Sequence, residues 1–182
     1  PRKMQIDAEY LRHLHQSISL VPEIASRPAM RLVGLRTCFY SVDSDKNNIG
    51  QCLPPLWDEF LARLGQVTHA VEGLCYGVVK PASDRDDLLD YVAVIEVGEG
   101  SRFPEDMVAL TVPACAYATF SHRGYPQHVD RTVDYIYSTW LLQSGRRHSG
   151  GADLEIYGKG YVPASAASEF HYAIPLADDD GQ

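Results

Sequence analysis

The stretch MRLVGLRTCFY, residues 30–40, and the stretch LPPLWDEFLARLG, residues 53–65, decide the fold of the first half of this chain. In the first stretch, the odd-numbered and the even-numbered residues form two sets whose side chains would point to opposite faces, as they do in a β-strand. In the second, apolar side chains recur three and four residues apart, which predicts an amphipathic helix. Pro54 and Pro55 suit the first turn of that helix, and Gly65 suits its C-terminal end.

Two further strands are predicted after this helix. They span residues 74–80 and 88–97, with a polar turn at residues 83–87 between them, and a loop follows at residues 98–106. The first half therefore reads strand, helix, strand, strand.

The second half of the chain repeats this order. An apolar run at residues 107–122, interrupted by a proline, predicts a strand or a pair of strands. An amphipathic helix is predicted over residues 129–141, with Gly145 at its end. Strands at residues 153–157 and 169–176 complete the pattern.

This duplicated order of elements predicts the fold class. Two β-α-β-β units can share one curved antiparallel sheet, with two main helices packed on it in a pseudo-two-fold arrangement. The class is α+β, and the junction of the two units is a natural place for a ligand crevice.

Composition narrows the classes of partner. The formal net charge of −8 argues against direct contact with nucleic acid, which needs a basic face. No apolar run approaches the ~20 residues that a membrane span needs, so no membrane contact is predicted. The four cysteines form no CxxC pair and no zinc spacing, which indicates reduced thiols in a cytoplasmic protein without a metal site or cofactor.

Seven stretches, in this order along the chain, resemble the GyrI-like superfamily of small-molecule-binding domains, the effector-binding domains of AraC-type and MerR-type transcription regulators. The resemblance begins at residue 20 and ends at residue 176. The stretches are MRLVGLR (30–36), PPLWDEFLARL (54–64), CYGVV (75–79), PACAYATFSHRG (113–124), VDYIYSTWLLQSG (133–145), ADLEIYG (152–158) and FHYAIPL (170–176).

The resemblance implies a domain organisation. Residues 20–177 form the effector-binding domain, residues 178–182 a flexible tail, and residues 1–19 a helix or linker with its helix at residues 7–18. The latter resembles the linker that follows the DNA-binding helices of an AraC-type regulator, which implies a covalently linked helix-turn-helix domain in a longer protein. The alternative is an independent helix that packs on the domain or makes a homodimer.

A lipophilic cation loses its water on binding, and a buried carboxylate beneath aromatic rings can replace that water. Along residues 153–157, Leu154 and Ile156 share one face of the strand, and Glu155 and Tyr157 share the other. If Leu154 and Ile156 pack beneath the helices, Glu155 faces the opposite, concave side. By resemblance, the glutamate of Glu-x-Tyr is the ligand-contacting acid of the family; the alternative is a solvent-facing strand glutamate.

Aromatic side chains are the predicted walls of the binding site. The chain holds 11 tyrosines and 5 phenylalanines, and a tyrosine offers both a ring and a hydroxyl. Core packing is the alternative for each of them, and the apolar helix stripes that carry both tryptophans favour the core for those two. With Glu155, the candidate ligand-binding residues are Tyr157, Tyr76, Trp57, Tyr117, Phe120, Tyr137, Tyr91 and Trp140.

The predicted function is the binding of an aromatic, cationic small molecule, a drug or xenobiotic, either as the sensor of a transcription regulator or as a free-standing binding protein. No catalytic residue is assigned. The same superfamily implies two alternatives: a hydrolase of reactive cyclopropane-bearing compounds that uses Glu155 as base or electrostatic stabiliser, and a gyrase-modulating interaction protein.

Overall fold

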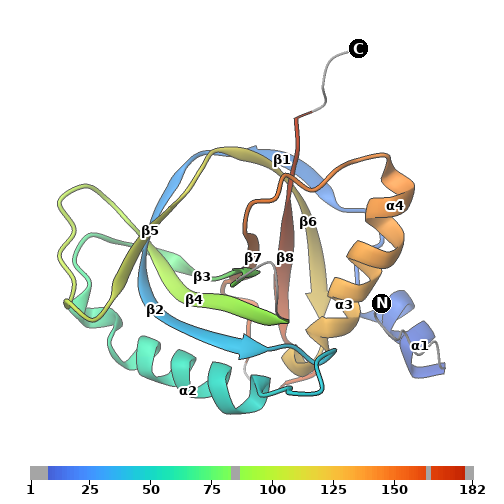
Figure 1. Cartoon of the computed structure of the whole chain (residues 1–182), viewed down its shortest axis with the longest axis horizontal. Helices are drawn as coiled ribbons and strands as arrows, with labels where there is room; N and C mark the ends of the chain where they lie inside the picture. Colours follow the sequence, from blue (N-terminus) through green and yellow to red (C-terminus); the bar gives the residue numbers. More distant parts are fainter. Residues whose placement is uncertain (1–7, 83–86, 163–164, 179–182) are drawn as a thin grey trace. The chain divides into compact units, whose positions relative to one another are not determined.

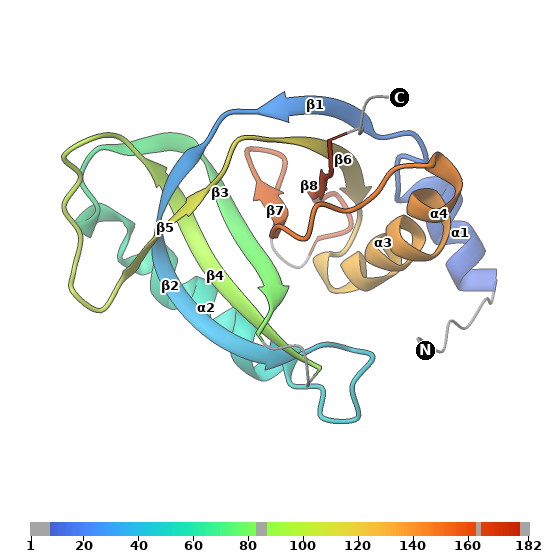
Figure 2. The ribbon, with the colours of Figure 1, turned by 45° about the horizontal axis from the view of Figure 1, so that its top comes forward.

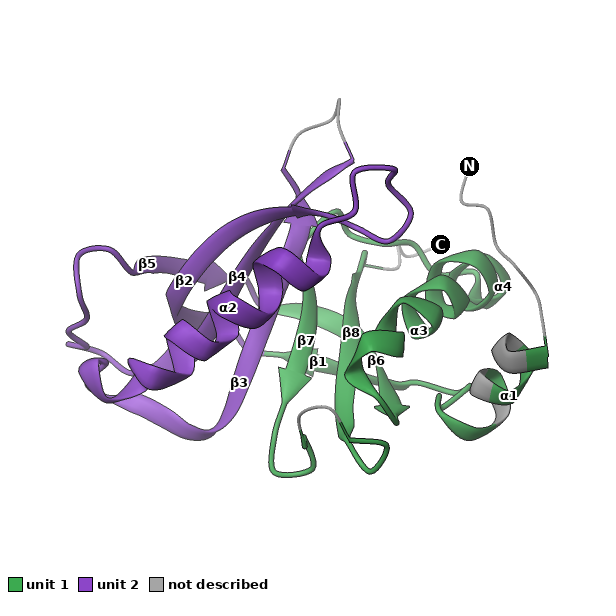
Figure 3. Ribbon diagram, turned by 90° about the horizontal axis from the view of Figure 1, so that it is seen from below, with its two compact units in different colours: residues 1–27, 115–182 green, residues 28–114 purple. Residues whose placement is uncertain are grey.

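The computed structural model shows the chain as two compact units (Figure 1 and Figure 3). Unit 1 comprises residues 1–27 and 115–182, and unit 2 comprises residues 28–114. The residues that the structure describes are 8–82, 87–162 and 165–178. Most of the predicted turn at residues 83–87 and most of the predicted tail lie outside them.

Unit 2 is built on a four-stranded antiparallel sheet. Its strands follow the order β3-β4-β2-β5, and β2 pairs with β4 through neighbours such as Leu35 and Ala93. Gly34 is required in β2, because a Cβ there would lie 1.8 Å from the carbonyl oxygen of Ala93. The strands are β2 (Met30–Tyr40), β3 (Ala70–Pro81), β4 (Leu88–Val97) and β5 (Val108–Val112).

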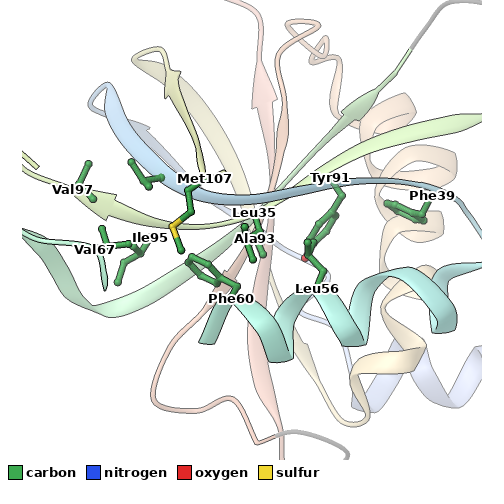
Figure 4. Packing of buried hydrophobic residues seen from close by; sticks show 11 residues of the cluster. Leu35, Phe39, Leu56, Phe60, Val67, Tyr91, Ala93, Ile95, Val97 and Met107 are labelled. Atoms are coloured by element: carbon green, nitrogen blue, oxygen red, sulfur yellow. The ribbon is translucent and has the colours of Figure 1, made fainter. Parts of the chain in front are cut away.

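Helix α2 (Ile49–Ala62) covers one face of this sheet and closes the core of unit 2 (Figure 4). Phe60 has no exposed surface and packs with Leu35 and Ile95 of the sheet. A short 3-10 turn at Leu64–Gln66 follows the helix and contains Gly65.

The helix begins one turn earlier than the sequence predicts, so Pro54 and Pro55 lie inside it and not in its first turn. The carbonyl oxygen of Asn48 accepts the first helical hydrogen bonds, from the N–H groups of Gln51 and Cys52. The N–H groups that the prolines lack would have reached carbonyls in the exposed first turn, which water can hydrate. This is why the prolines are tolerated there.

Unit 1 has a sheet of the same kind (Figure 1). Its strands follow the order β1-β6-β8-β7 and are all antiparallel. They are β1 (Glu23–Arg27), β6 (Cys115–Arg123), β7 (Asp153–Tyr157) and β8 (Glu169–Leu176).

One helical segment covers the sheet of unit 1. It starts after a 3-10 turn at Pro126–His128 and runs through α3 (Val129–Tyr135), the π-helical turn η3 (Ile136–Trp140) and α4 (Leu141–Ser144). Gly145 ends it in the left-handed conformation, with φ 71°, as predicted.

Helix α1 (Ala8–Gln16) lies beside α3, and Leu14 packs against the apolar cluster of unit 1. Ile18, just after α1, is buried in the same cluster. The N-terminal segment therefore packs on unit 1 in the range that the structure describes; its role as a linker stays a prediction.

The duplication is confirmed, and so is the α+β class. Each repeat runs strand, helix, strand, strand, as β2-α2-β3-β4 in unit 2 and as β6, helix, β7, β8 in unit 1. Each unit then gains a strand that precedes the other repeat along the chain: β1 pairs with β6, and β5 pairs with β2. The chain crosses between units at Pro28–Ala29 and again at Pro113–Ala114, so the apolar run at residues 107–122 is two strands with different partners.

Phe60→Ala tests the core of unit 2. Removing a fully buried phenylalanine should lower the free energy of unfolding by about 3–5 kcal/mol, measured by denaturant titration. Leu61→Ala on the same helix is the control, because Leu61 is 49% exposed and its loss should change stability by less than about 1 kcal/mol. Equal losses for the two variants would contradict this packing.

Candidate functional site

Strand β7 places its two acids on the helix-covered face of unit 1, meaning the side of the sheet that packs under α3 and η3. Glu155 lies opposite Tyr172 of β8, and directly opposed residues point to the same side. Tyr172 belongs to the apolar cluster that includes Phe120 and the helical residue Ile136. Glu155 therefore points toward the helix.

This corrects the predicted orientation of the strand. Leu154 and Ile156 were expected beneath the helices, and they lie on the other face, where both are buried. The alternation along a strand separates its two faces, but it does not say which face a helix covers. Both faces of β7 are buried, so the more apolar pair of side chains does not identify the face that lies under the helix.

Glu155 is nonetheless a buried acid among aromatic rings. Glu155 is 8% exposed, and the hydroxyl of Tyr157 donates a hydrogen bond of 2.8 Å to its Oε2. The Tyr157 ring stacks on Phe170 at 5.1 Å between centroids and meets the edge of Tyr161 at 4.6 Å. Burial, and then the charge of Glu155, raise the pKa of Tyr161, so this phenol stays neutral at physiological pH.

Asp153 is a second buried acid on the same face, and it is not among the site residues predicted from the sequence. Its Oδ2 accepts hydrogen bonds from the hydroxyls of Tyr137, at 2.6 Å, and Tyr172, at 2.8 Å. Its Oδ1 accepts one from Nε2 of His148 at 2.9 Å. The spacing of Asp153 two residues before Glu155 was the signal available, since residues at that spacing share a face of a strand.

Burial and the Asp153 carboxylate together raise the pKa of Tyr172 well above its ordinary value of 10.0. Tyr172 is therefore a neutral donor. Its hydroxyl donates a hydrogen bond to Asp153 and adds no second negative charge beside that carboxylate.

His148 is held as one tautomer. The N–H of Gly150 donates to its Nδ1 at 2.9 Å, so Nδ1 carries no proton and Nε2 carries the one that it donates to Asp153. The loop around it is fixed to the end of β8, because the N–H of Ser149 donates to the Pro175 carbonyl at 3.0 Å. Asp153 thus joins the helix, this loop and strand β8.

The π-helical turn carries two aromatic residues that the helix directs at the sheet. Tyr137 reaches Asp153, and Trp140 meets the Phe120 ring edge-on at 5.2 Å between centroids. A π-turn inserts an extra residue into a helix and is frequent at functional sites. The apolar spacing predicted a regular helix here, and nothing in the sequence marks the extra residue.

The remaining predicted aromatics lie elsewhere. Trp57 and Tyr91 pack together in the core of unit 2, where the indole Nε1 donates to the Tyr91 hydroxyl at 2.9 Å and the rings meet edge-on at 6.4 Å. Tyr76 is buried on β3, on the face opposite α2. Tyr117 is buried on the face of β6 opposite the helix, and burial raises its pKa to about 12.

The structure thus brings five predicted residues to the helix-covered face of unit 1 and leaves four outside it. The five are Glu155, Tyr157, Tyr137, Phe120 and Trp140.

Within the described ranges, no group of three or more His, Cys, Asp and Glu side chains is arranged to hold a metal ion. In the same part of the chain, none of the helices combines the length and the apolarity that crossing a bilayer requires. The groups present at β7 are carboxylates, phenols and rings, which attract positive charge, form hydrogen bonds and stack.

Buried acids and rings are the kinds of group that orient a bound small molecule. The model of the GyrI-like small molecule binding domain matches residues 21–177, and the chain belongs to that family.

One relative of this chain is a transcriptional regulator. The chain is 33% identical over 156 residues to the transcriptional regulator BrlR of Pseudomonas aeruginosa PAO1, covering 84% of this chain and 54% of that protein. The chain thus spans about half the length of that relative.

Two solved structures share the fold. One is SAV2435 bound to tetraphenylphosphonium, with TM-score 0.66 and 13% identity over 86% of this chain and 94% of that one. The other is EcmrR in its complex with DNA, with TM-score 0.63 and 16% identity over 94% of this chain and 63% of that one.

The Asp153 network predicts a graded loss of stability. Tyr137→Phe removes one hydrogen bond to a charged acceptor and should lower the free energy of unfolding by about 1–3 kcal/mol. Asp153→Asn should cost more, about 3–5 kcal/mol, because one amide cannot accept from all three donors. Denaturant titration of both variants checks the order; a Tyr137→Phe loss as large as that of Asp153→Asn would refute the shared network.

His122 is the buried titratable base of unit 1. It has no exposed surface; Thr132 Oγ1 lies 2.8 Å from its Nδ1, and its Nε2 donates to the Tyr125 carbonyl at 3.2 Å. Burial lowers the pKa of His122 below the ordinary 6.5. At a pH between these two pKa values, His122 is protonated in the unfolded chain and neutral in the folded chain.

His122 should therefore make stability fall on mild acidification. Its contribution is complete above the unfolded pKa of about 6.5 and is lost as the pH drops toward the lower folded value. The loss should approach about 1.4 kcal/mol per pH unit in that window. Unfolding titrations at pH 7.5, 6.5 and 5.5 should show a smaller slope for His122→Gln than for the unmodified protein, and equal slopes would remove His122 as the cause.

Proposed function

We propose that this chain binds a lipophilic, aromatic, cationic small molecule through Glu155 on the helix-covered face of unit 1. The observation that carries the proposal is that Glu155 is 8% exposed and accepts a hydrogen bond from the half-buried Tyr157, whose ring stacks on Phe170. A buried carboxylate among rings attracts a cation that has lost its water, because the negative charge and the ring faces both offset the lost hydration.

The residues beside Glu155 suit this ligand class. Tyr157 donates to the carboxylate and is half-buried, so its ring can shift and let a cation approach Oε2. Rings of tyrosine and tryptophan attract a desolvated cation by about 0.5–2 kcal/mol for each good contact. Tyr137, Phe120 and Trp140 are the proposed aromatic wall, whereas Trp57 and Tyr91 hold each other in the core of unit 2 and receive no ligand role.

Family membership and relatives support the ligand class and its use. SAV2435 shares the fold and its structure holds tetraphenylphosphonium, a lipophilic aromatic cation. BrlR is a transcriptional regulator and is longer than this chain, and EcmrR was solved on DNA. We therefore propose that this domain senses an effector for a linked DNA-binding domain, which requires the ligand to favour one of two states of the regulator.

Titration with tetraphenylphosphonium tests the role of Glu155. We expect saturable binding in the micromolar range, followed by calorimetry or tryptophan fluorescence. Glu155→Gln keeps the size of the side chain and removes its charge, so the dissociation constant of the cation should rise about tenfold or more. Triphenylphosphine oxide, a neutral compound with three of the same rings, should lose less than about twofold.

A matched control is Glu169→Gln on the neighbouring strand β8, whose side chain is 42% exposed and pairs with Arg123 on the surface. It removes the same net charge and should leave binding of the cation unchanged. Equal loss of the cation and the neutral compound in Glu155→Gln, or equal loss in both variants, would take Glu155 out of its proposed role.

A further inference from the structure

Among the residues that the structure describes, no strand pairs with the outer edge of β1 in the sheet of unit 1. Strand β1 is the terminal strand in the sheet order and pairs with β6 on one side (Figure 2). Glu23, Ile24, Ala25 and Ser26 are exposed, and Arg27 is half-buried. An open strand edge presents N–H and C=O groups that another strand can pair with, unless charges or prolines prevent it.

We propose that β1 pairs antiparallel with β1 of a second copy of this chain, centred on Ala25. The sequence of the strand, EIASR, is self-complementary in that register. Glu23 then lies opposite Arg27 of the second copy, and Arg27 lies opposite its Glu23. Opposite charges facing each other across two strands stabilise the pair, and a two-fold axis makes that contact twice.

The residues that flank β1 fit the same axis. Pro22 and Pro28 each lie three residues from Ala25, one before it and one after it. In the proposed register each proline is opposite the other, so both ends of the ladder stop at the same point. Prolines at these positions confine pairing to the five residues of β1 and oppose any slipped register that would draw a proline into the ladder.

Apolar surface near the edge adds to the contact. Ile24 is 47% exposed, and in this register it lies diagonal to Ile24 of the second copy on the same face of the joined sheets. Leu20 and Val21, just before the strand, are 42% and 82% exposed. Because two copies of net charge −8 repel each other, the local Glu23–Arg27 contacts must hold the pair together against that repulsion.

Reversing the charges one at a time tests the register. The full chain is studied by sedimentation velocity and equilibrium over a concentration series up to about 0.5 mM, a range that covers weak, small interfaces. The unmodified protein should dimerise as its concentration rises. Glu23→Arg and Arg27→Glu each place like charges opposite each other twice and should raise the dimer dissociation constant about tenfold or more.

Two complementary measurements separate pairing from misfolding. An equimolar mixture of Glu23→Arg and Arg27→Glu restores opposite charges at both contacts and should form a heterodimer at concentrations where each variant alone is monomeric. The double variant Glu23→Arg, Arg27→Glu should dimerise like the unmodified protein. Because β1 also pairs with β6, thermal unfolding of each variant confirms that the strand stays in place.

Glu105→Arg is the control, since Glu105 is exposed in unit 2 and its reversal changes the net charge by the same amount as Glu23→Arg. Because either reversal changes the net charge from −8 to −6 and so weakens the repulsion between copies, Glu105→Arg should leave the dissociation constant unchanged or lower it. A dissociation constant raised as much by Glu105→Arg as by Glu23→Arg would show that the loss is not specific to the β1 register. The proposal is also overturned if the unmodified protein stays monomeric throughout the series or if the mixed variants fail to associate. None of these outcomes bears on ligand binding at Glu155.

Discussion

Two carboxylates on one buried face of one strand are the constraint on which unit 1 depends. Asp153 and Glu155 lie under the helix, where an ion without partners would cost several kcal/mol. Asp153 is held by Tyr137 of the helix, Tyr172 of β8 and His148 of the loop. The helix, the loop and the strand therefore have to meet at one carboxylate, and the π-turn and the fixed tautomer of His148 are the local adjustments that let them do so.

The same geometry separates the roles of the two acids. Asp153 is bound by donors from three different elements, so releasing it would loosen the helix, the loop and the sheet together. Glu155 shares a hydrogen bond with Tyr157, which stands two residues away on the same strand and is half-buried. A rearrangement there involves the Tyr157 ring and the rings of Phe170 and Tyr161 beside it, and none of these is a donor to Asp153. This is why the proposed ligand contact falls on Glu155, while Asp153 belongs to the frame.

Local periodicity in the sequence predicted most of the helices and strands, but it could not predict which distant strands pair. Strands β2, β4, β7 and β8 have the bounds that alternation predicted, because the alternation reflects which side chains each strand buries. The exchange of β1 and β5 between repeats depends on pairings far apart in the sequence, such as Ala25 with Tyr117. The start of α2 depends on Asn48, whose carbonyl accepts the first helical hydrogen bonds. The face to which Glu155 points depends on where the helix packs on the sheet. The pattern of side chains within one strand or helix predicts neither.

The duplication makes the difference between the repeats informative. Strands β3 and β7 hold the same place in their repeats, and the side chains that β3 turns toward α2 include Cys75 and Val79, which join an apolar core. The side chains that β7 turns toward its helix are Asp153 and Glu155. The same architecture thus accommodates apolar side chains on that face of the strand, so the acids in unit 1 are not demanded by the fold. Asp153 serves the frame through its three donors, and under the proposed function Glu155 is retained for the capture of a desolvated cation.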